Sequence, residues 1–519
     1  MVELIVRDFY RNLRRSNTIK NPRPNILFIV FDQMRADALI GPLADTIELP
    51  NFTQFKNESV SFLNHFSVTS PCGPARASLL TGQYAMNHHS VRNGTPLAHD
   101  TSNLAKSLSS KGIEPLLYGY TDTSQDPRMY KQGDPILTSY EEVLNGFTEV
   151  QEMRFDTNKS WKNYLRGKNY KFDKLSEIFE PVDKKINAPA QYSAEDSDTA
   201  FLTDCLLGDL PKRKHGWCAH VTYVRPHPPF VAPAPYNSLI SPNEMPSVHT
   251  LDTSGKHPFD DISKQFRLAK DMVIGFRDLK ECPETTSEIR AVYMGLVAEL
   301  DTHLGRIFQW LKDTKQYDQT SIIITSDHGE MLGDYGCWGK MHYLDGAFHV
   351  PLMIKPPKSF DGDFGTTIDA PSESIDVTPT ILDLMGIEIP DEMDGSSLKP
   401  FLLGKKPEDW KKVTMSEVDF GDPVKPTIWQ SQLGLSSHEC NFSVLRSGRH
   451  RIVNFANKLP QILFEVKEDG GINFLNDKEK YQETKLNMVS ELLSHRMRNA
   501  GGKFSRIMIT EKGPLKGTF

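Results

Sequence analysis

Residues 72–82 read Cys-Gly-Pro-Ala-Arg-Ala-Ser-Leu-Leu-Thr-Gly and predict a helix that begins at a cysteine. Pro74 suits the first turn of a helix because its missing N–H is not needed there, and good helix formers follow it. Cys72 would then lie at the positive end of the helix dipole, where anions and anionic transition states are stabilised. Arg76, one turn on, can add a bidentate contact to a tetrahedral oxyanion. The stretch predicts a cysteine-based anion site, with a buried free cysteine on an ordinary helix as the alternative.

Two continuous apolar runs, at residues 25–31 and 320–325, are typical of strands buried on both faces of a parallel sheet. Polar residues follow each run directly, and the carboxyl ends of parallel strands meet at one edge of a sheet. These residues are Asp32, Gln33, Asp327 and His328. Two carboxylates, an amide and an imidazole can together bind a divalent metal ion. The sequence therefore predicts a metal site at this edge, although the first pair taken alone would also fit a turn.

The spacing Cys-x-Pro-x-Arg-x-x-x-x-Thr-Gly within residues 72–82 resembles the signature of the sulfatase family of the alkaline phosphatase superfamily. In that family the cysteine is oxidised to formylglycine, so the resemblance implies a formylglycine-generating enzyme as a partner. It implies an α/β fold with a large, mixed, mostly parallel sheet flanked by helices. It also implies that Cys72 supplies the nucleophile and binds the metal, with Arg76 beside it as a catalytic residue.

Residues 119–122 read Gly-Tyr-Thr-Asp where most sulfatases have Gly-Lys-Trp-His. A tyrosine in place of the lysine resembles the phosphonate monoester hydrolase and phosphodiesterase branch of the family. Tyr120 and Asp122 are therefore candidate substrate-binding residues, but that branch leads us to expect threonine at position 122, which leaves the role of Asp122 open. Asn93 could donate to a substrate oxygen, with a turn-forming asparagine before Gly94 as the alternative.

Residues 225–230, Arg-Pro-His-Pro-Pro-Phe, resemble the same branch. Prolines on both sides restrict the backbone around His227, which we expect to be a general acid or a substrate donor. A structural histidine is the alternative. Lys340, in the sequence Gly-Lys-Met-His at 339–342, stands where the family carries a substrate-binding lysine, and a solvated surface lysine is the alternative.

The resemblance implies hydrolysis of a tetrahedral ester by a covalent route. Hydrated formylglycine carries two hydroxyl groups; one, made nucleophilic by the metal, attacks phosphorus or sulfur, and the other expels the bound group. Arg76 and Lys340 would stabilise the charged oxygens, and His227 would help the leaving oxygen to depart. Gln33 and His328 replace two ligands of the mostly aspartate set of sulfatases. This change favours manganese, with iron, zinc, calcium and magnesium possible.

These differences favour hydrolysis of phosphonate monoesters and phosphodiesters over hydrolysis of sulfate esters. The first alternative is an arylsulfatase with promiscuous phosphoesterase activity. The second is a homologue that binds metal and anions but is never converted at Cys72, and so does not turn over.

The sequence predicts an N-terminal arm at residues 1–24, a catalytic α/β domain at 25–403 and a smaller C-terminal subdomain at 404–519. A polar insertion at about 124–192 is expected near the mouth of the site. The C-terminal part contains short β-like runs and a final helix, so we expect an antiparallel sheet with one covering helix. The predicted apolar face of that helix comprises Leu486, Val489, Leu493 and Met497.

A net charge of −7 over 519 residues, without a polybasic run, argues against partners such as nucleic acid or a membrane surface. The chain shows no signal-peptide pattern and no apolar run of membrane-spanning length. Six cysteines without paired spacing fit a reducing compartment. We therefore expect a cytoplasmic protein that acts on a small phosphate, phosphonate or sulfate ester, and related hydrolases imply a homo-tetramer.

Overall fold

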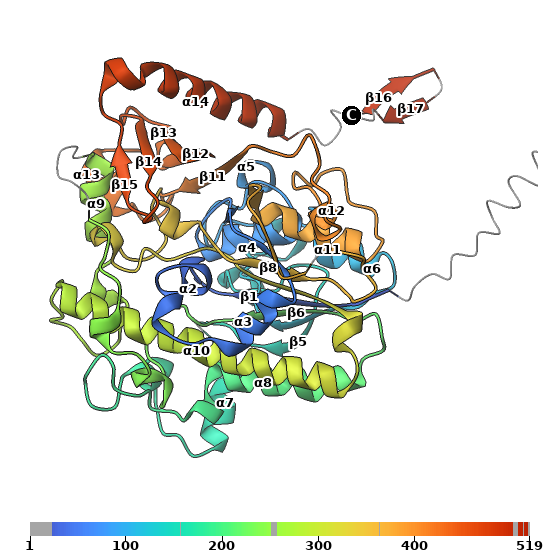
Figure 1. The fold of residues 1–519 in the computed structure, drawn as a ribbon, viewed down its shortest axis with the longest axis vertical. Coiled ribbons are helices and arrows are strands. Elements are labelled where there is room, and N and C mark those ends of the chain that lie inside the picture. Colours follow the sequence, from blue (N-terminus) through green and yellow to red (C-terminus); the bar gives the residue numbers. More distant parts are fainter. Residues whose placement is uncertain are drawn as a thin grey trace, which may run out of the picture.

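The computed structural model of the protein describes residues 23–155, 157–250, 257–362, 364–501, 507–511 and 513–516. The arm predicted at residues 1–24 lies outside these residues except for its last two. Figure 1 shows a large sheet with helices on both sides and a second, smaller sheet beside a long helix.

The large sheet has eight strands in the order β5-β4-β6-β1-β7-β8-β2-β9. These strands are β1 (Asn25–Phe31), β2 (Val60–Phe62), β4 (Pro115–Gly119), β5 (Thr148–Glu152), β6 (Cys218–Tyr223), β7 (Thr320–Ser326), β8 (Leu352–Lys355) and β9 (Thr366–Ile368). All neighbouring pairs are parallel except those of β8, which runs antiparallel to β7 and β2. The mixed, mostly parallel sheet predicted from the sequence is confirmed.

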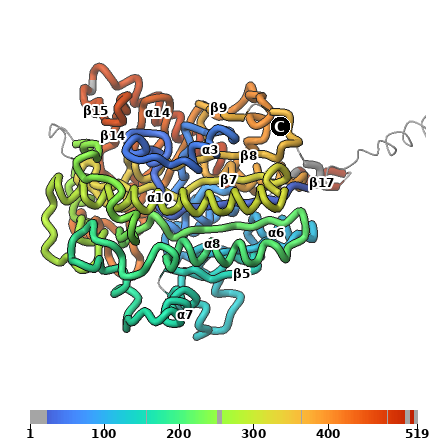
Figure 2. Tube along the Cα trace, turned by 60° about the horizontal axis from the view of Figure 1, so that its bottom comes forward, coloured from blue at the N-terminus to red at the C-terminus, as the bar shows by residue number. Residues whose placement is uncertain are grey.

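Alternate residues of β1 point into two hydrophobic layers, one on each face of the sheet. The first layer is covered by α3 (Pro50–Asn57), α8 (Asp198–Asp209) and α10 (Pro283–Asp313). The second is covered by α4 (Cys72–Thr81), α6 (Leu104–Ser109), α11 (Val377–Leu384) and α12 (Lys399–Leu402). Figure 2 shows α10 and α8 side by side along the first face. Because both faces of β1 are covered, the residues after its carboxyl end emerge at the edge of the sheet.

The predicted insertion at about 124–192 contains β5 and α7 (Lys159–Gly167). β5 pairs with β4 and forms one edge of the large sheet, a strand that its polar sequence does not predict. Trp161 of α7 is fully buried, with the rings of Tyr192 and Phe179 at 5.3 and 5.9 Å. Trp161 Nε1 also donates to the carbonyl oxygen of Asp196 at 2.9 Å, so this hydrogen bond and the β4–β5 pairing anchor the segment to the domain.

The smaller sheet is antiparallel throughout, in the order β11-β12-β13-β14-β15. Its strands are β11 (Val413–Asp419), β12 (Asn441–Ser447), β13 (His450–Phe455), β14 (Ile462–Val466) and β15 (Ile472–Phe474). α14 (Lys478–Asn499) contacts β12 and β13 (Figure 1). The predicted antiparallel sheet with one covering helix is confirmed.

The predicted apolar face of α14 is wrong at three of its four residues, whereas the fourth, Val489, packs against a buried hydrophobic cluster. Leu486, Leu493 and Met497 are 66, 59 and 71% exposed. The buried side chains of this helix are instead Met488, Leu492 and His495. His495 Nε2 lies 3.0 Å from the hydroxyl of Tyr84 in the catalytic domain. A polar contact thus helps to choose the packed face, and hydrophobic periodicity alone could not show it.

The remaining helices and strands are α2 (Asp37–Ile40), α5 (Ala85–His88), α9 (Pro258–Phe266), α13 (Ile428–Leu433), β3 (His65–Phe66), β10 (Ser372–Glu373), β16 (Ile507–Thr510) and β17 (Gly513–Lys516). Across the part of the chain that the structure describes, no helix is both long and apolar enough to cross a membrane.

Candidate active site

α4 begins at Cys72 and ends before Gly82, as residues 72–82 predict, and all its residues are buried. Gly82 has a φ of 68°, the left-handed conformation that commonly ends a helix. Pro71 cannot cap the first turn with a side-chain hydrogen bond; instead, Asn93 Oδ1 accepts a hydrogen bond from the Gly73 N–H at 2.9 Å. Cys72 therefore lies at the N-terminus of a buried helix, where the helix dipole favours negative charge.

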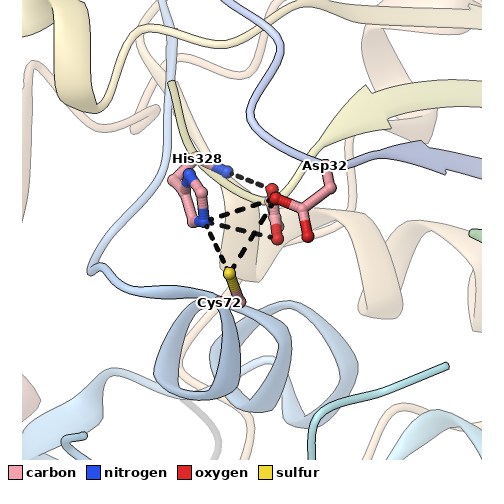
Figure 3. A group of neighbouring side chains, drawn as sticks. Asp32, Cys72 and His328 are labelled. Atoms are coloured by element: carbon pink, nitrogen blue, oxygen red, sulfur yellow. Dashed lines mark hydrogen bonds and ion pairs between the residues drawn. The ribbon is translucent and has the colours of Figure 1, made fainter. Parts of the chain in front are cut away.

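Three buried side chains, two carboxyl groups and an imidazole, surround the thiol of Cys72 (Figure 3). The donor atoms of Asp32, Cys72, Asp327 and His328 all lie within 4.8 Å of one another. His328 Nε2 is 3.2 Å from Cys72 Sγ and 3.5 Å from the nearer Asp327 oxygen. The two carboxylates come from the ends of β1 and β7, which are adjacent in the sheet. The structure thus brings together the strand-end residues that the sequence singles out.

This cluster fits a divalent cation. Asp327 Oδ1 accepts two backbone N–H groups, whereas its buried Oδ2 has no hydrogen-bond partner and lies 3.0 Å from Arg76 Nη2. Burial and the nearby Asp32 raise the pKa of Asp327 to about 6. Burial lowers the pKa of His328 far below its usual value, which leaves the imidazole neutral, as a metal ligand must be. Two close carboxylates with a neutral imidazole form a donor set that a cation would stabilise.

Gln33 and Lys340 complete one side of the cluster. Lys340 Nζ donates to Gln33 Oε1 at 2.6 Å and lies 3.0 Å from Cys72 Sγ. Although burial opposes its charge, the pKa of Lys340 is raised by Cys72, Asp32 and Asp327. We call Asp32, Gln33, Cys72, Asp327 and His328 the floor of the site.

Arg76 lies behind the floor. Its Nη2 donates to Asp32 Oδ2 at 3.1 Å and to the Tyr120 hydroxyl at 3.0 Å, and its guanidinium stacks 4.1 Å from the centre of the Tyr120 ring. The Tyr120 hydroxyl in turn donates to Asp32 Oδ2. Tyr120 lines the cavity that opens above the floor, whereas Arg76 does not. The structure therefore puts Arg76 in contact with both carboxylates of the floor. Of the three guanidinium nitrogens of Arg76, only Nε is buried without a hydrogen bond.

Asp122 lies at the cavity with its carboxyl group poorly satisfied. Its backbone is in the left-handed region (φ 47°), and its buried Oδ1 has no hydrogen-bond partner. Its Oδ2 is 3.9 Å from Arg76 Nε. Burial raises the pKa of Asp122 well above its usual value, against the opposing effect of Arg76. The carboxyl group is available to a ligand, which is compatible with the substrate-binding role predicted for it.

His227 lines the same cavity. Its Nδ1 lies 2.5 Å from the carbonyl oxygen of Pro228, so Nδ1 carries the proton and Nε2 is free to accept. Burial and Lys340 lower the pKa of His227 to about 3. Arg225 fixes this loop by donating to the carbonyl oxygens of His227 and Pro229 at 3.3 and 2.9 Å. The ring is thus neutral and held in place.

The cavity above the floor has a volume of about 380 Å³. Five of its other lining residues, which we call the wall, are Tyr140, Phe155, Phe266, Arg267 and Met341. The ring of Phe155 contacts His227 edge to face, with 4.9 Å between centroids. The cavity joins a charged floor to a partly aromatic wall, an arrangement suited to a small ester with one anionic group and an apolar substituent.

Sequence and structure comparisons agree with this geometry. The Sulfatase family model matches residues 24–387. The chain belongs to the sulfatase family. The multifunctional alkaline phosphatase superfamily protein PehA of Trinickia caryophylli is 36% identical over 467 residues, covering 86% of this chain and 90% of that protein. A choline-sulfatase of Rhizobium meliloti (strain 1021) is 28% identical, covering 74% of this chain and 72% of that protein.

Two solved structures of this family superpose closely on the chain. A phosphonate monoester hydrolase of Silicibacter pomeroyi is 46% identical, with a TM-score of 0.92 over 95% of this chain and 99% of that one. A phosphonate monoester hydrolase of Agrobacterium radiobacter is 35% identical, with a TM-score of 0.88 over 96% and 100%. The predicted family and its fold are confirmed. Membership of the sulfatase family implies a metal ion and a formylglycine derived from the cysteine of the signature, Cys72.

Several residues at the site are not predicted from the sequence. Only two signals pointed to the wall: the insertion expected near the mouth of the site, which supplies Tyr140 and Phe155, and the Gly-Lys-Met-His stretch at 339–342, which contains Met341. Glu330, two residues after His328, is fully buried and accepts a hydrogen bond from Gln33 Nε2. Its position two residues after the strand-end pair Asp327 and His328 is the signal in the sequence that could have pointed to it.

Proposed function

We propose that this protein is a metal-dependent hydrolase of phosphonate monoesters and phosphodiesters that acts through a formylglycine formed at Cys72. The observation that carries the proposal is the floor itself, in which Gln33, His328 and Cys72 lie together beside Tyr120. Two solved structures that are 46% and 35% identical to the chain are phosphonate monoester hydrolases, which supports the same substrate class.

Asp32, Gln33, Asp327 and His328 would hold the metal ion together with residue 72. An amide and an imidazole among the ligands favour manganese, with iron, zinc, calcium and magnesium as the other candidates. When bound, the ion would supply Lewis-acid activation of the nucleophile and of the substrate oxygens.

The protein's own residues supply the rest of the chemistry. Lys340 would stabilise the charged oxygens of the substrate, since its ammonium group lies 3.0 Å from Cys72 Sγ. The positive end of the α4 dipole would add to this effect. Asn93 holds the first turn of α4 in place through Gly73. Arg76 would orient Asp32 and Tyr120, and Tyr120 and Asp122 would contact the substrate from the cavity side.

His227 would act on the leaving oxygen. In the free protein its Nε2 carries no proton, so the ring must take one up before it can donate. An anionic substrate in the cavity would favour this uptake because it offsets the effect of Lys340. The ring would then give the proton to the leaving oxygen as the bond to phosphorus breaks.

Conversion of Cys72 requires a formylglycine-generating enzyme, which we propose as the partner of this chain. We further propose a cytoplasmic homo-tetramer. The six cysteines are all free thiols, in keeping with a reducing compartment. The exposed side chains of Leu486, Leu493 and Met497 on α14 offer an apolar surface for contact with a second copy.

Substrate profiling tests the proposed activity. With manganese bound and residue 72 converted, we expect kcat/KM to be higher for p-nitrophenyl phenylphosphonate and bis(p-nitrophenyl) phosphate than for p-nitrophenyl sulfate. A higher value for the sulfate would assign the protein as an arylsulfatase with secondary phosphoesterase activity. Converted, metal-loaded protein without activity on any of the three esters would contradict the proposal.

A further inference from the structure

Glu330 is buried behind the floor and joins two parts of it. Its side chain has no solvent exposure and lies in the loop after β7. One carboxylate oxygen, Oε2, accepts from Gln33 Nε2. The other, Oε1, accepts from the backbone N–H of Leu332 at 3.0 Å and from that of Gly339. Glu330 therefore contacts Gln33 directly and, through Gly339, the backbone that precedes Lys340.

The two ends of the Gln33 amide face partners of opposite kind. Lys340 is an ammonium group that can only donate, so it must face the amide oxygen, at 2.6 Å. Glu330 accepts three N–H groups, so it must face the amide nitrogen. The orientation of this amide is thus fixed by hydrogen-bond chemistry. Only the oxygen of an amide can bind a metal ion, so this orientation decides whether Gln33 can be a ligand.

We propose that Glu330 is a positioning residue that turns the carbonyl oxygen of Gln33 toward the metal site and fixes the backbone that carries Lys340. This inference rests on the proposed metal-dependent function and extends it to a residue outside the ligand set. The backbone of Gln33 is held separately: its N–H donates to Asp327 Oδ1 at 3.0 Å, and its carbonyl accepts from the Tyr293 hydroxyl at 3.1 Å. Glu330 therefore acts on the side chain of Gln33 and not on its place in the fold.

The substitution Glu330→Gln tests the direction of these hydrogen bonds without changing the size of the side chain. The oxygen of the new amide can keep the two backbone N–H contacts, but its NH2 group then faces Gln33. Two NH2 groups cannot bond to each other, so the Gln33 amide must turn its oxygen toward position 330 and its nitrogen toward Lys340. The metal site then loses an oxygen donor and gains a group that repels both Lys340 and the ion.

The readout is the affinity of the apoprotein for Mn²⁺, measured by calorimetric titration without substrate. We expect Glu330→Gln to weaken binding by about 10- to 100-fold, the usual range for residues that orient metal ligands. Glu299→Gln is the matched control, because Glu299 is equally buried on α10 and has no contact with Gln33. We expect the control to bind Mn²⁺ as the wild type does.

The double variant Gln33→Glu/Glu330→Gln exchanges donor and acceptor and separates positioning from general damage. A carboxylate at position 33 can accept from the new NH2 group with one oxygen and from Lys340 with the other, so Mn²⁺ affinity should recover at least tenfold over Glu330→Gln. Wild-type affinity in Glu330→Gln, or no recovery in the double variant, would overturn the inference. If Glu330→Gln does not fold, the single variant Gln33→Glu replaces it in the test. In Gln33→Glu the carboxylates at positions 33 and 330 face each other, so this variant should bind Mn²⁺ more weakly than the double variant. These titrations use no ester, so their outcome is independent of the substrate proposed above.

Discussion

The floor and the wall of the cavity are built differently. Floor residues are at most 6% exposed, follow strand ends or begin a buried helix, and are tied together by hydrogen bonds and ion pairs. Wall residues come from the insertion and from the segments around Phe266 and Met341, and Phe155 and Arg267 are partly or largely exposed. A rigid floor suits bond breaking, which needs fixed geometry, whereas a loop-borne wall can vary with the substrate. The comparison assigns the chemistry to the floor and the choice of substituent to the wall.

The largest effect is expected from Cys72→Ser. A serine hydroxyl at the N-terminus of α4 can still attack, but it lacks the second hydroxyl that releases the bound group. We expect at most one equivalent of leaving group, an ester adduct on residue 72 visible by mass spectrometry, and a loss of sustained turnover of roughly a thousandfold or more. Cys205→Ser, at a half-buried thiol in α8, should keep full activity. Repeated turnover by Cys72→Ser without an aldehyde at residue 72 would contradict the role of a formylglycine at this position.

His328→Ala should lower metal occupancy as well as rate. His328 Nε2 lies within 3.8 Å of Cys72 and both carboxylates, so its loss removes a neutral donor from the centre of the cluster. Elemental analysis of the purified variant checks this, with His89→Ala, at an exposed residue, as the control. Full occupancy in His328→Ala would move this residue out of the ligand set.

The affinity of the floor for Mn²⁺ should fall as the pH is lowered, because Asp327 becomes protonated. The pKa of Asp327 is about 6 without metal, because burial and Asp32 oppose its charge. Below pH 6 the proton competes with the ion, so the affinity for Mn²⁺ should fall by up to about tenfold per pH unit. Above pH 7 the contribution of Asp327 to this dependence should vanish, since its carboxyl group is already ionised. Titrations from pH 5 to 8 check the prediction, and equal affinities at pH 5 and 7 would contradict it.

The smallest effect is expected at the wall. Phe155→Ala removes the ring that contacts His227 and part of the cavity wall. We expect kcat/KM for aryl esters to fall by about 3- to 10-fold, the value of one aromatic contact, and to fall less for methyl esters. Phe172→Ala, in the same insertion but away from the cavity lining, is the control. Equal losses on aryl and methyl esters would mean that the wall does not choose the substituent.

The floor could be predicted from the sequence because its residues follow local rules. Buried parallel strands can be recognised in the sequence as apolar runs, and the polar residues that follow them must meet at one edge of the sheet. Asp32 and Asp327 are almost 300 positions apart, yet the adjacent strands β1 and β7 bring them together. The proline after Cys72 likewise marks the start of α4.

The wall, Glu330 and the placement of Arg76 could not be predicted in the same way. Phe155 reaches the cavity only because β5 joins the edge of the large sheet, a pairing that its polar sequence does not signal. Arg76 was expected to bind a substrate oxyanion, but its contacts with Asp32 and Tyr120 depend on side-chain directions that spacing does not give. The packed face of α14 includes His495, whose Nε2 lies 3.0 Å from the Tyr84 hydroxyl, and periodicity does not show this contact.

The most direct test of the account is the chemical state of residue 72. Protein purified from its native host should be digested, and the peptide that contains Cys72 should be measured by mass spectrometry with and without an aldehyde-specific hydrazide. The account predicts an aldehyde at residue 72 that reacts with the hydrazide, in proportion to the specific activity of each preparation. A peptide that carries only the cysteine thiol, in protein that hydrolyses phosphonate monoesters, would contradict it.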